Sequence, residues 1–319
     1  MCVGAVHEPL RPRTATGRRH AGTAHRAARL HHRGNRHHRH RGRHRDVHVA
    51  VPTLSESATV LRLRAAGCVF AEEEAALLVA QAGSDAELEA MVLRRIEGIP
   101  LEHILGWAEF AGIRVGVDAA VFVPRRRTEF LAGLALAFAR EASGAQPTVL
   151  DLCCGSGAIA LVVETGIPGA RVFAADIDPA AVRTARRNLA RPDRVFEGDL
   201  FAPLPAGLAG SFDVIVANTP YVPTEALSLM PPEARLHESR VALDGGDDGL
   251  DVQRRVAACA ADWLAPDGRL LVEVNEAQAP SVIRIFTAAG LEAHAESSDE
   301  FEVTVVVGRL LDSILQHFS

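Results

Sequence analysis

Lysine is absent from this chain of 319 residues, and tyrosine occurs only once. Without lysine, the chain cannot form a P-loop nucleotide site, which needs a phosphate-binding lysine. Cysteine is also scarce. The five cysteines are scattered and odd in number, which excludes a disulfide framework and favours a reducing compartment, the cytoplasm. No run of about 18 apolar residues is free of charge, so no membrane-spanning helix is expected.

Charge is divided unevenly along the chain. Residues 1–50 hold 12 arginines and 2 acidic residues, a net charge of +10, whereas the remainder holds 22 arginines and 38 acidic residues, a net charge of −16. Ten of the 14 histidines also lie in the first 50 residues. This segment has almost no apolar periodicity, so we expect residues 1–51 to form a disordered tail.

Three interpretations of this tail stay open. It binds RNA nonspecifically through its arginines, it binds metal through its histidines, or it is upstream sequence translated from a misassigned start. The first residues lack a long apolar core after their charges, so no signal peptide is expected.

From Pro52 onward the sequence has the pattern of a folded protein. Three short helices are expected between residues 52 and 106, with Thr53 or Ser55 capping the first and Ser84 capping the third. Short β-like pieces around Gly112 and Gly116 predict a β-hairpin linker over residues 107–127. A helix is expected from about Thr128, where the second domain, residues 128–319, begins.

Strands and helices alternate from about residue 146 onward. This β-α-β-α order predicts an α/β fold with a doubly wound, mostly parallel sheet. In such sheets ligands bind beyond the carboxyl ends of the strands. Three predicted strands end there in polar or small residues, in the segment 151–157, at Asp176 and at Asn218. Their convergence predicts the position of the site.

The first strand-to-helix turn predicts a cofactor site. Its glycines, Gly155 and Gly157, let the backbone approach a ligand, although a tight structural turn explains them equally well. Asp176 follows at the end of the next strand, where an acid accepts hydrogen bonds from a ribose diol. Asp178 is a competitor for that role, but it precedes Pro179 and fits a helix N-cap better.

The third strand adds Asp199 and Leu200, which we expect to border an adenine ring. The turn lacks the third glycine of a dinucleotide site, so the site fits S-adenosylmethionine better than NAD or ATP. The predicted cofactor-binding residues are Asp151, Cys153, Cys154, Gly155, Ser156, Gly157, Asp176, Asp199, Leu200 and Asn218. Cys153 and Cys154 have no second cysteine pair beside them, so no metal is expected.

The tetrad Asn218-Thr219-Pro220-Tyr221 is the predicted catalytic element. The side-chain oxygen of Asn218 and the backbone carbonyl of Thr219 are two acceptors that can hold both N–H groups of a planar amide or amino group. This orients the nitrogen lone pair toward a methyl donor. Tyr221 offers an aromatic wall. An ordinary Asn-Pro turn is the competing structural interpretation.

On these motifs the chain resembles the protein-(glutamine-N5) methyltransferases that modify the Gly-Gly-Gln loop of peptide chain release factors. That family carries Asn-Pro-Pro-Tyr at the tetrad and a cofactor loop close to D-L-G-x-G-S-G. It also has a linker pattern P-R-P-E-T-E, seen here as Pro124-Arg125-Arg126-Arg127-Thr128-Glu129. The segments PLEHILGWAEFAG and ALDGGDDGLD are similar as well. The likeness covers about residues 55–310.

The resemblance implies a class I S-adenosylmethionine-dependent methyltransferase with a Rossmann-like, seven-stranded sheet and a small N-terminal helical domain for substrate recognition. It implies a release factor as the protein substrate of a cytoplasmic monomer, without a membrane or specific nucleic-acid partner. Thr219, Cys153 and Arg127 depart from the family pattern. The alternatives are a ribosomal-protein glutamine, a nucleic-acid amino group, or an inactive cofactor-binding paralogue. The acidic body disfavours nucleic acid.

Overall fold

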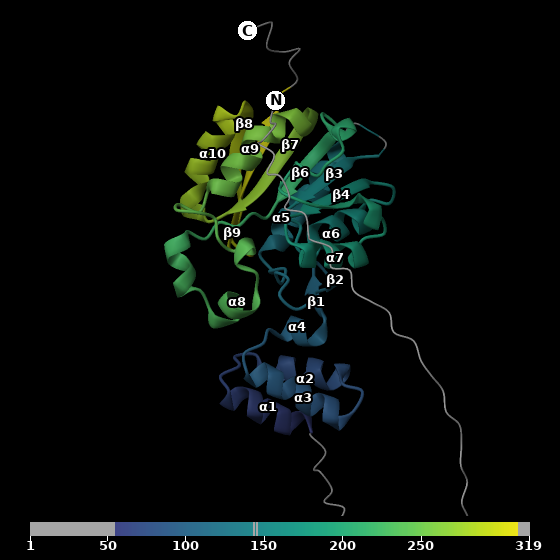
Figure 1. The fold of residues 1–319 in the computed structure, drawn as a ribbon, viewed down its shortest axis with the longest axis vertical. Coiled ribbons are helices and arrows are strands. Elements are labelled where there is room, and N and C mark those ends of the chain that lie inside the picture. Colours follow the sequence, from purple (N-terminus) through teal and green to yellow (C-terminus); the bar gives the residue numbers. More distant parts are fainter. Residues whose placement is uncertain (1–54, 143, 145, 312–319) are drawn as a thin grey trace, which may run out of the picture. The chain divides into compact units, whose positions relative to one another are not determined.

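The computed structural model describes residues 55–142, 144 and 146–311 (Figure 1). The expected Arg- and His-rich tail, residues 1–51, lies outside the described residues. Within the described part, no helix combines the length and the apolar character that crossing a membrane requires.

The N-terminal segment of the described chain forms a small helical module. Its helices are α1 (Glu56–Ala65), α2 (Ala71–Gln81), α3 (Asp85–Ile96) and α4 (Leu101–Leu105). The Ser55 hydroxyl accepts a hydrogen bond from the Ala58 N–H at 3.3 Å, and the Ser84 hydroxyl accepts one from Glu87 at 3.2 Å. Each satisfies a backbone donor that a helix start leaves open. Apolar side chains from the four helices pack into one core.

A buried ion pair joins two helices of this module. The guanidinium of Arg95 contacts Glu74 through Nε at 2.6 Å and Nη2 at 3.1 Å, and its Nη1 lies 2.7 Å from Glu233. Arg95 and Glu74 are only 9% and 8% exposed. Removing one partner would therefore leave the other as an unpaired charge in a poorly solvated environment.

We expect Arg95→Met to lower the free energy of unfolding by about 3 kcal/mol, because it leaves Glu74 buried without its partner. Arg64→Met is the matched control, since Arg64 pairs with Glu72 at the surface and exposed pairs contribute less than about 1 kcal/mol. Chemical denaturation of both variants measures the difference. Equal losses of unfolding free energy in the two variants would show that burial of the ion pair does not determine its contribution to stability.

A short hairpin follows the helical module. Strands β1 (Trp107–Phe110) and β2 (Ile113–Gly116) pair antiparallel, with Phe110 opposite Ile113. The two turn residues Ala111 and Gly112 have positive φ angles of 50° and 73°. Two central residues with positive φ are typical of the type I′ turn that fits the twist of a two-residue hairpin.

Within the described residues, the remaining strands form one seven-stranded sheet in the order β5-β4-β3-β6-β7-β9-β8. All neighbours pair parallel except β9, which is antiparallel to both β7 and β8. The predicted doubly wound, mostly parallel α/β fold is confirmed. The strands are β3 (Thr148–Leu152), β4 (Arg171–Asp176), β5 (Val195–Glu197), β6 (Phe212–Ala217), β7 (Leu264–Val274), β8 (Leu291–Ser298) and β9 (Val303–Leu310).

The sheet has a hydrophobic core on each face because alternate residues of a strand point to opposite sides. Val149 and Val214 belong to one core, and their neighbours Leu150 and Ile215 belong to the other. The first core includes helices α5 (Thr128–Glu141), α6 (Ala158–Gly166) and α7 (Pro179–Asn188). The second includes α9 (Asp251–Trp263) and α10 (Ala279–Ala288). A short helix α8 (Pro232–His237) lies in the connection between β6 and α9.

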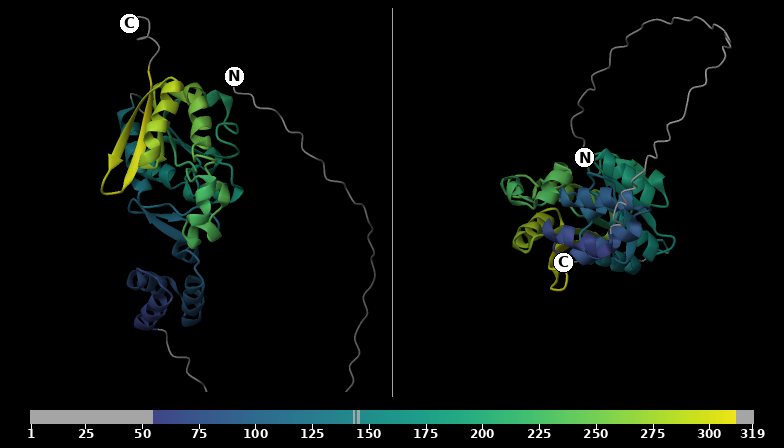
Figure 2. Two further views of the ribbon diagram at one scale, coloured as in Figure 1. Left: turned by 90° about the vertical axis from the view of Figure 1, so that its left-hand side faces the viewer. Right: turned by 90° about the horizontal axis from the view of Figure 1, so that it is seen from below.

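Strand β8 was not expected from the sequence. Among the described residues it pairs only with β9, and it forms one edge of the sheet (yellow in Figure 2, left). Its polar residues Glu292, His294 and Glu296 leave it without the apolar run of a buried strand, and most of its side chains are exposed or half-buried. Edge strands tolerate this polarity because one side faces water.

Candidate active site

Three strand ends form one cavity at the carboxyl edge of the sheet. Asp151 on β3, Asp176 on β4 and Asn218 after β6 line it together. The predicted site residues that line this cavity are Asp151, Cys153, Cys154, Gly155, Ser156, Asp176, Asn218, Thr219, Pro220 and Tyr221. The β3, β4 and β6 strands are adjacent in the sheet, so the sequence-predicted convergence of their ends is present in the structure.

The turn after β3 is held by the two carboxylates at its sides. The Gly155 N–H donates to Asp176 Oδ2 at 2.9 Å, and the Ala160 N–H donates to Asp151 Oδ2 at 3.0 Å. Both Cys153 and Gly155 have positive φ angles, 55° and 54°. Cys153 thus adopts a left-handed conformation, which costs a non-glycine residue about 1–2 kcal/mol.

Asp176 and Asp178 have different surroundings. Asp176 Oδ1 also accepts the Asp178 N–H at 2.8 Å, so each of its oxygens holds one backbone donor of the cavity wall. Each carboxylate oxygen has a second lone pair left for a ligand hydroxyl. Asp178 caps α7 by accepting the Ala180 N–H at 2.8 Å, as its position before Pro179 predicts.

The chemistry of the cavity fits S-adenosylmethionine. Asp151 Oδ1 is fully enclosed and accepts no hydrogen bond from the described residues, so a buried acceptor at this wall still lacks a donor. The ammonium group of the cofactor would supply that donor, and Asp176 would accept from the ribose. Apolar side chains for a flat base complete the wall: Phe110, Phe122, Ile159, Ile177 and Ala181.

The ionisation of Asp151 makes cofactor affinity depend on pH. Burial, aided by the negative charge of Asp176, raises the pKa of Asp151 to about 7, although its hydrogen bond from Ala160 opposes the shift. Below this pKa the ligand-free carboxyl is protonated, and a cationic ligand must displace that proton. Affinity should therefore tighten as pH rises toward about 7, by up to tenfold per unit, and then level off.

Calorimetric titration with S-adenosylmethionine between about pH 5.5 and about pH 8 measures this slope. In Asp151→Asn the affinity should be weaker and its pH dependence smaller. An unchanged slope in that variant would assign the titration to another group.

Three predicted cofactor residues do not line the cavity. Gly157 is the N-cap of α6 and has φ +77°, and a Cβ there would meet the Ala185 Cβ at 3.2 Å, so packing against α7 accounts for this glycine. The carboxylate of Asp199 lies 2.5 Å from the Arg255 guanidinium. Leu200 packs against the core on the α9 side of the sheet.

The tetrad follows β6 at the other side of the same cavity. Asn218 Nδ2 donates to the Thr128 hydroxyl at 3.3 Å, whereas its Oδ1 accepts no hydrogen bond from the described residues. Thr219 is only 2% exposed. The Pro220 carbonyl is contacted by Gln253 Nε2 at 3.5 Å. The acceptor atom on which the prediction depends, Asn218 Oδ1, is therefore available to a ligand.

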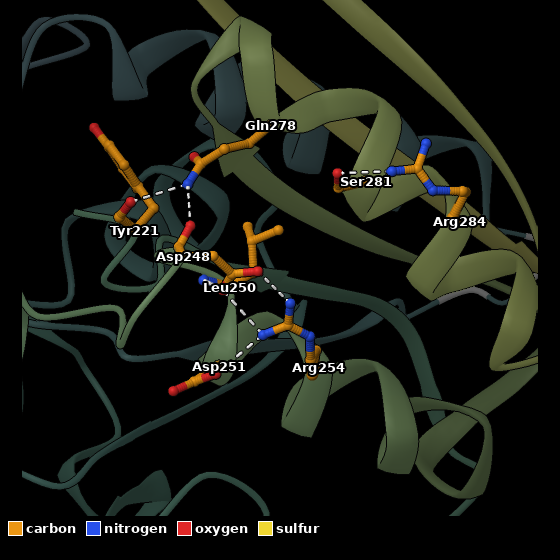
Figure 3. Close-up of polar contacts among 8 residues, drawn as sticks. All are labelled: Tyr221, Asp248, Leu250, Asp251, Arg254, Gln278, Ser281 and Arg284. Carbon is orange, nitrogen blue, oxygen red and sulfur yellow. Dashed lines mark hydrogen bonds and ion pairs between the residues drawn. The ribbon is translucent and has the colours of Figure 1, made fainter. Parts of the chain in front are cut away.

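Tyr221 is held at both ends. Gln278 Nε2 donates to the Tyr221 carbonyl at 3.1 Å and to the Asp248 carbonyl at 3.2 Å, which ties the tetrad to the loop before α9 (Figure 3). Gly249 packs so closely that a Cβ there would lie 2.3 Å from the Tyr221 carbonyl oxygen. The glycines of the segment ALDGGDDGLD thus permit a close approach to the tetrad backbone.

The tyrosine hydroxyl contacts a group that sequence reasoning missed. It receives a hydrogen bond from Arg127 Nη2 and lies 3.5 Å from Glu273 Oε1. Arg127 Nε donates to the same Glu273 oxygen at 3.2 Å. Burial, with the charge of Glu273, raises the pKa of Tyr221 to about 12. A glutamate inside the apolar strand run LLVEV was the available signal, because a buried charge needs a reason.

His103 is not among the residues that line the cavity. His103 is buried, and its Nε2 lies 2.8 Å from the Val121 carbonyl, as a structural histidine would. Across residues 55–142, 144 and 146–311, no three side chains of His, Cys, Asp or Glu gather in a way that would hold a metal ion.

Comparison with known proteins places the chain among methyltransferases. Residues 132–303 match the family described as the methyltransferase small domain. The release factor glutamine methyltransferase of Gloeobacter violaceus is 40% identical over 205 residues, which cover 62% of this chain and 70% of that protein. The enzyme of the same name from Deinococcus radiodurans is 41% identical over 216 residues, which cover 66% and 75%.

A relative with a different name is almost as similar. The 4-amino-L-phenylalanine/4-methylamino-L-phenylalanine methyltransferase of Streptomyces pristinaespiralis is 38% identical over 211 residues, which cover 65% of this chain and 71% of that protein. The family model spans more than half of the chain, and the matched relatives are covered over more than two thirds of their length. The chain therefore belongs to the release factor glutamine methyltransferase family, which is built on the methyltransferase small domain.

Proposed function

We propose that this protein methylates the side-chain nitrogen of a glutamine in a protein, and that this glutamine lies in the Gly-Gly-Gln loop of a peptide chain release factor. The observation that carries the proposal is Asn218, whose Nδ2 is engaged by Thr128 and whose Oδ1 is free at the cavity. A free amide oxygen beside a carbonyl is what a planar NH₂ group requires. The names of the relatives support the same substrate.

S-adenosylmethionine, when bound, supplies a methyl group on an electrophilic sulfonium. Asn218 Oδ1 and the Thr219 carbonyl accept the two N–H groups of the substrate amide and so orient its nitrogen lone pair. Tyr221 packs against the flat amide. Methyl transfer from the bound cofactor would leave the amide nitrogen positively charged, and the nitrogen would then release one proton to water. No general base is needed for this order of events.

The remaining parts of the molecule have proposed roles as well. We assign substrate recognition to the helical module within residues 52–106, joined to the catalytic domain, residues 128–319, by the linker 107–127. We also propose that the protein acts as a monomer in the cytoplasm, where a translation protein would be available as its substrate.

A free aromatic amino acid is the second candidate substrate. Arg127 lies beside the Tyr221 hydroxyl and its side chain is 47% exposed, so its guanidinium is placed to meet a substrate carboxylate at the far end of the tyrosine ring. The relative named for 4-amino-L-phenylalanine shows that the family includes proteins named for such compounds.

Isotopic methyl transfer separates the candidates. The protein is incubated with labelled S-adenosylmethionine and, in separate reactions, with a release factor, with ribosomal proteins and with 4-amino-L-phenylalanine. We expect label in the release factor. Label in the free amino acid alone would replace the first proposal by the second. Cofactor binding without label in any reaction would overturn both.

A further inference from the structure

A second pocket adjoins the active-site cavity. Most of its wall comes from the helical module, and Arg125 lines both this pocket and the cavity. Five carboxylates and two guanidinium groups line it, which gives it a formal net charge of −3, and we call it the acidic pocket. Its charged residues are Glu73, Glu74, Arg95, Glu102, Arg125, Glu233 and Glu238.

The two arginines leave part of this negative charge unpaired. Arg95 is shared between two of the glutamates, and Arg125 pairs with a third, Glu238. Among the described residues, the side chains of Glu73 and Glu102 have no hydrogen-bond or ion-pair partner. Two carboxylates of the acidic pocket are therefore open to a cation.

Glu238 is an independent sign that a ligand donor is missing here. The residue is 7% exposed, and its Oε1 accepts from the Val123 N–H at 3.3 Å and from the Arg125 guanidinium. Its Oε2 is fully enclosed and has no hydrogen-bond partner within the described part of the chain. A buried carboxylate oxygen without a donor costs free energy. A ligand that brings an N–H group to this oxygen removes that cost.

We propose that the acidic pocket binds an arginine side chain of the protein substrate, at a position near the methylated glutamine; this proposal rests on the proposed function. A guanidinium carries five N–H donors in one plane, so it can donate to several carboxylate oxygens at once. Phe70 is 65% exposed and offers an aromatic surface to a cation. The apolar lining suits the aliphatic stem of arginine: Phe70, Leu77, Pro100 and Leu101.

The position of the acidic pocket suits a residue that flanks the reacting glutamine. Arg125 separates it from the cavity, so one extended segment of substrate can occupy both. Pro100, Leu101 and Glu102 come from the segment PLEHILGWAEFAG, and this proposal gives that segment a part in substrate binding. The adjacent His103 holds it to the linker through the Val121 carbonyl at 2.8 Å. Nucleic acid does not fit this pocket, because its phosphates carry the same charge as the carboxylates.

The kinetic test removes charge and keeps shape. We expect the double variant Glu73→Gln/Glu102→Gln to raise KM for the release factor by about 10- to 100-fold, because each hydrogen bond between charged groups contributes about tenfold or more. The value of kcat and the affinity for S-adenosylmethionine should stay within about twofold of wild type, since neither glutamate lines the cavity.

Glu97→Gln is the matched control. Glu97 is an exposed glutamate of the same helical module and does not line the acidic pocket, so its KM should stay within about twofold of wild type. Thermal unfolding should be nearly the same for all variants, because Glu73 and Glu102 have no partner to lose. A release factor that is methylated with unchanged KM by the double variant would overturn the proposal.

A binding measurement tests the acidic pocket without methyl transfer. The probe is N-acetyl-argininamide, and N-acetyl-citrullinamide is its neutral counterpart of nearly equal shape. In nuclear magnetic resonance titrations, the backbone amide signals of Phe70 and Glu102 should move with the arginine probe in the wild type. They should not move with the citrulline probe, nor with the arginine probe in the double variant.

The two measurements fail separately. If the arginine probe moves these signals while the wild type methylates no release factor, the proposed function fails and the cation site stands. If the arginine probe moves nothing, or if both probes act equally, the acidic pocket is not a cation site and the proposal is overturned even where the release factor is methylated.

Discussion

Asn218→Ala should lower the rate of methyl transfer by about 100- to 1,000-fold, the usual effect of removing one preorganised polar contact to a reacting group. Asn218 Oδ1 is free at the cavity because Nδ2 is already engaged by Thr128. Alanine removes this acceptor and leaves the substrate amide with only the Thr219 carbonyl. Single-turnover measurement with saturating cofactor reports the loss in the chemical step.

The control for this prediction is cofactor binding. The carboxylates that we assign to the cofactor, Asp151 and Asp176, lie on β3 and β4 and do not depend on Asn218 for their hydrogen bonds. Calorimetry should therefore give a dissociation constant within about threefold of the wild-type value. Transfer at near wild-type rate would remove the tetrad from the mechanism, and a loss of both activities would make Asn218 mainly a cofactor residue.

Asp176→Ala should weaken S-adenosylmethionine binding by at least about 100-fold. Hydrogen bonds to a charged group contribute about 1.5–3 kcal/mol each, and the ribose would lose two of them. The same carboxylate also holds the N–H groups of Gly155 and Asp178, so its loss loosens the turn that forms the cavity wall. Calorimetric titration gives the affinity, and thermal unfolding shows whether the fold is retained.

Asp178→Ala is the matched control for Asp176. Asp178 caps α7 through the Ala180 N–H, so its removal should cost about 1 kcal/mol of stability. Cofactor affinity should change only a few-fold. If Asp178→Ala weakened cofactor binding more than Asp176→Ala, Asp178 would be the residue that binds the ribose.

The sequence predicts the central strands of this fold well. The runs at 148–152, 171–176 and 212–217 are apolar and lie between turn residues, which is typical of strands buried on both faces. Strand β8 escapes prediction because Glu292, His294 and Glu296 give it the polarity of a surface loop. Its pairing with β9 depends on a partner strand, and periodicity within one segment cannot show that.

The candidate site is predictable to the same extent. Asp151, Asp176 and Asn218 each end a strand, and adjacent parallel strands must place such ends together. Asp199 follows the same rule but lies beside Arg255, because β5 is a short strand at the sheet edge. Sequence position alone does not show which way that carboxylate turns.

The network behind the tetrad lay beyond sequence reasoning. Arg127 and Glu273 are 146 residues apart and meet only because α5 begins beside the end of β7. Arg127 was visible as a departure from the family pattern, and its partner was not. The burial of Glu273 in a core strand was the sign that such a partner existed.

Peptide mass spectrometry of a release factor tests the central claim most directly. The release factor is incubated with this protein and S-adenosylmethionine, digested, and compared with a reaction containing Asn218→Ala. We predict one added methyl group on the side-chain nitrogen of the Gly-Gly-Gln glutamine with the wild type and none with the variant. An unmodified glutamine, under conditions where the wild type binds the cofactor, would contradict the account.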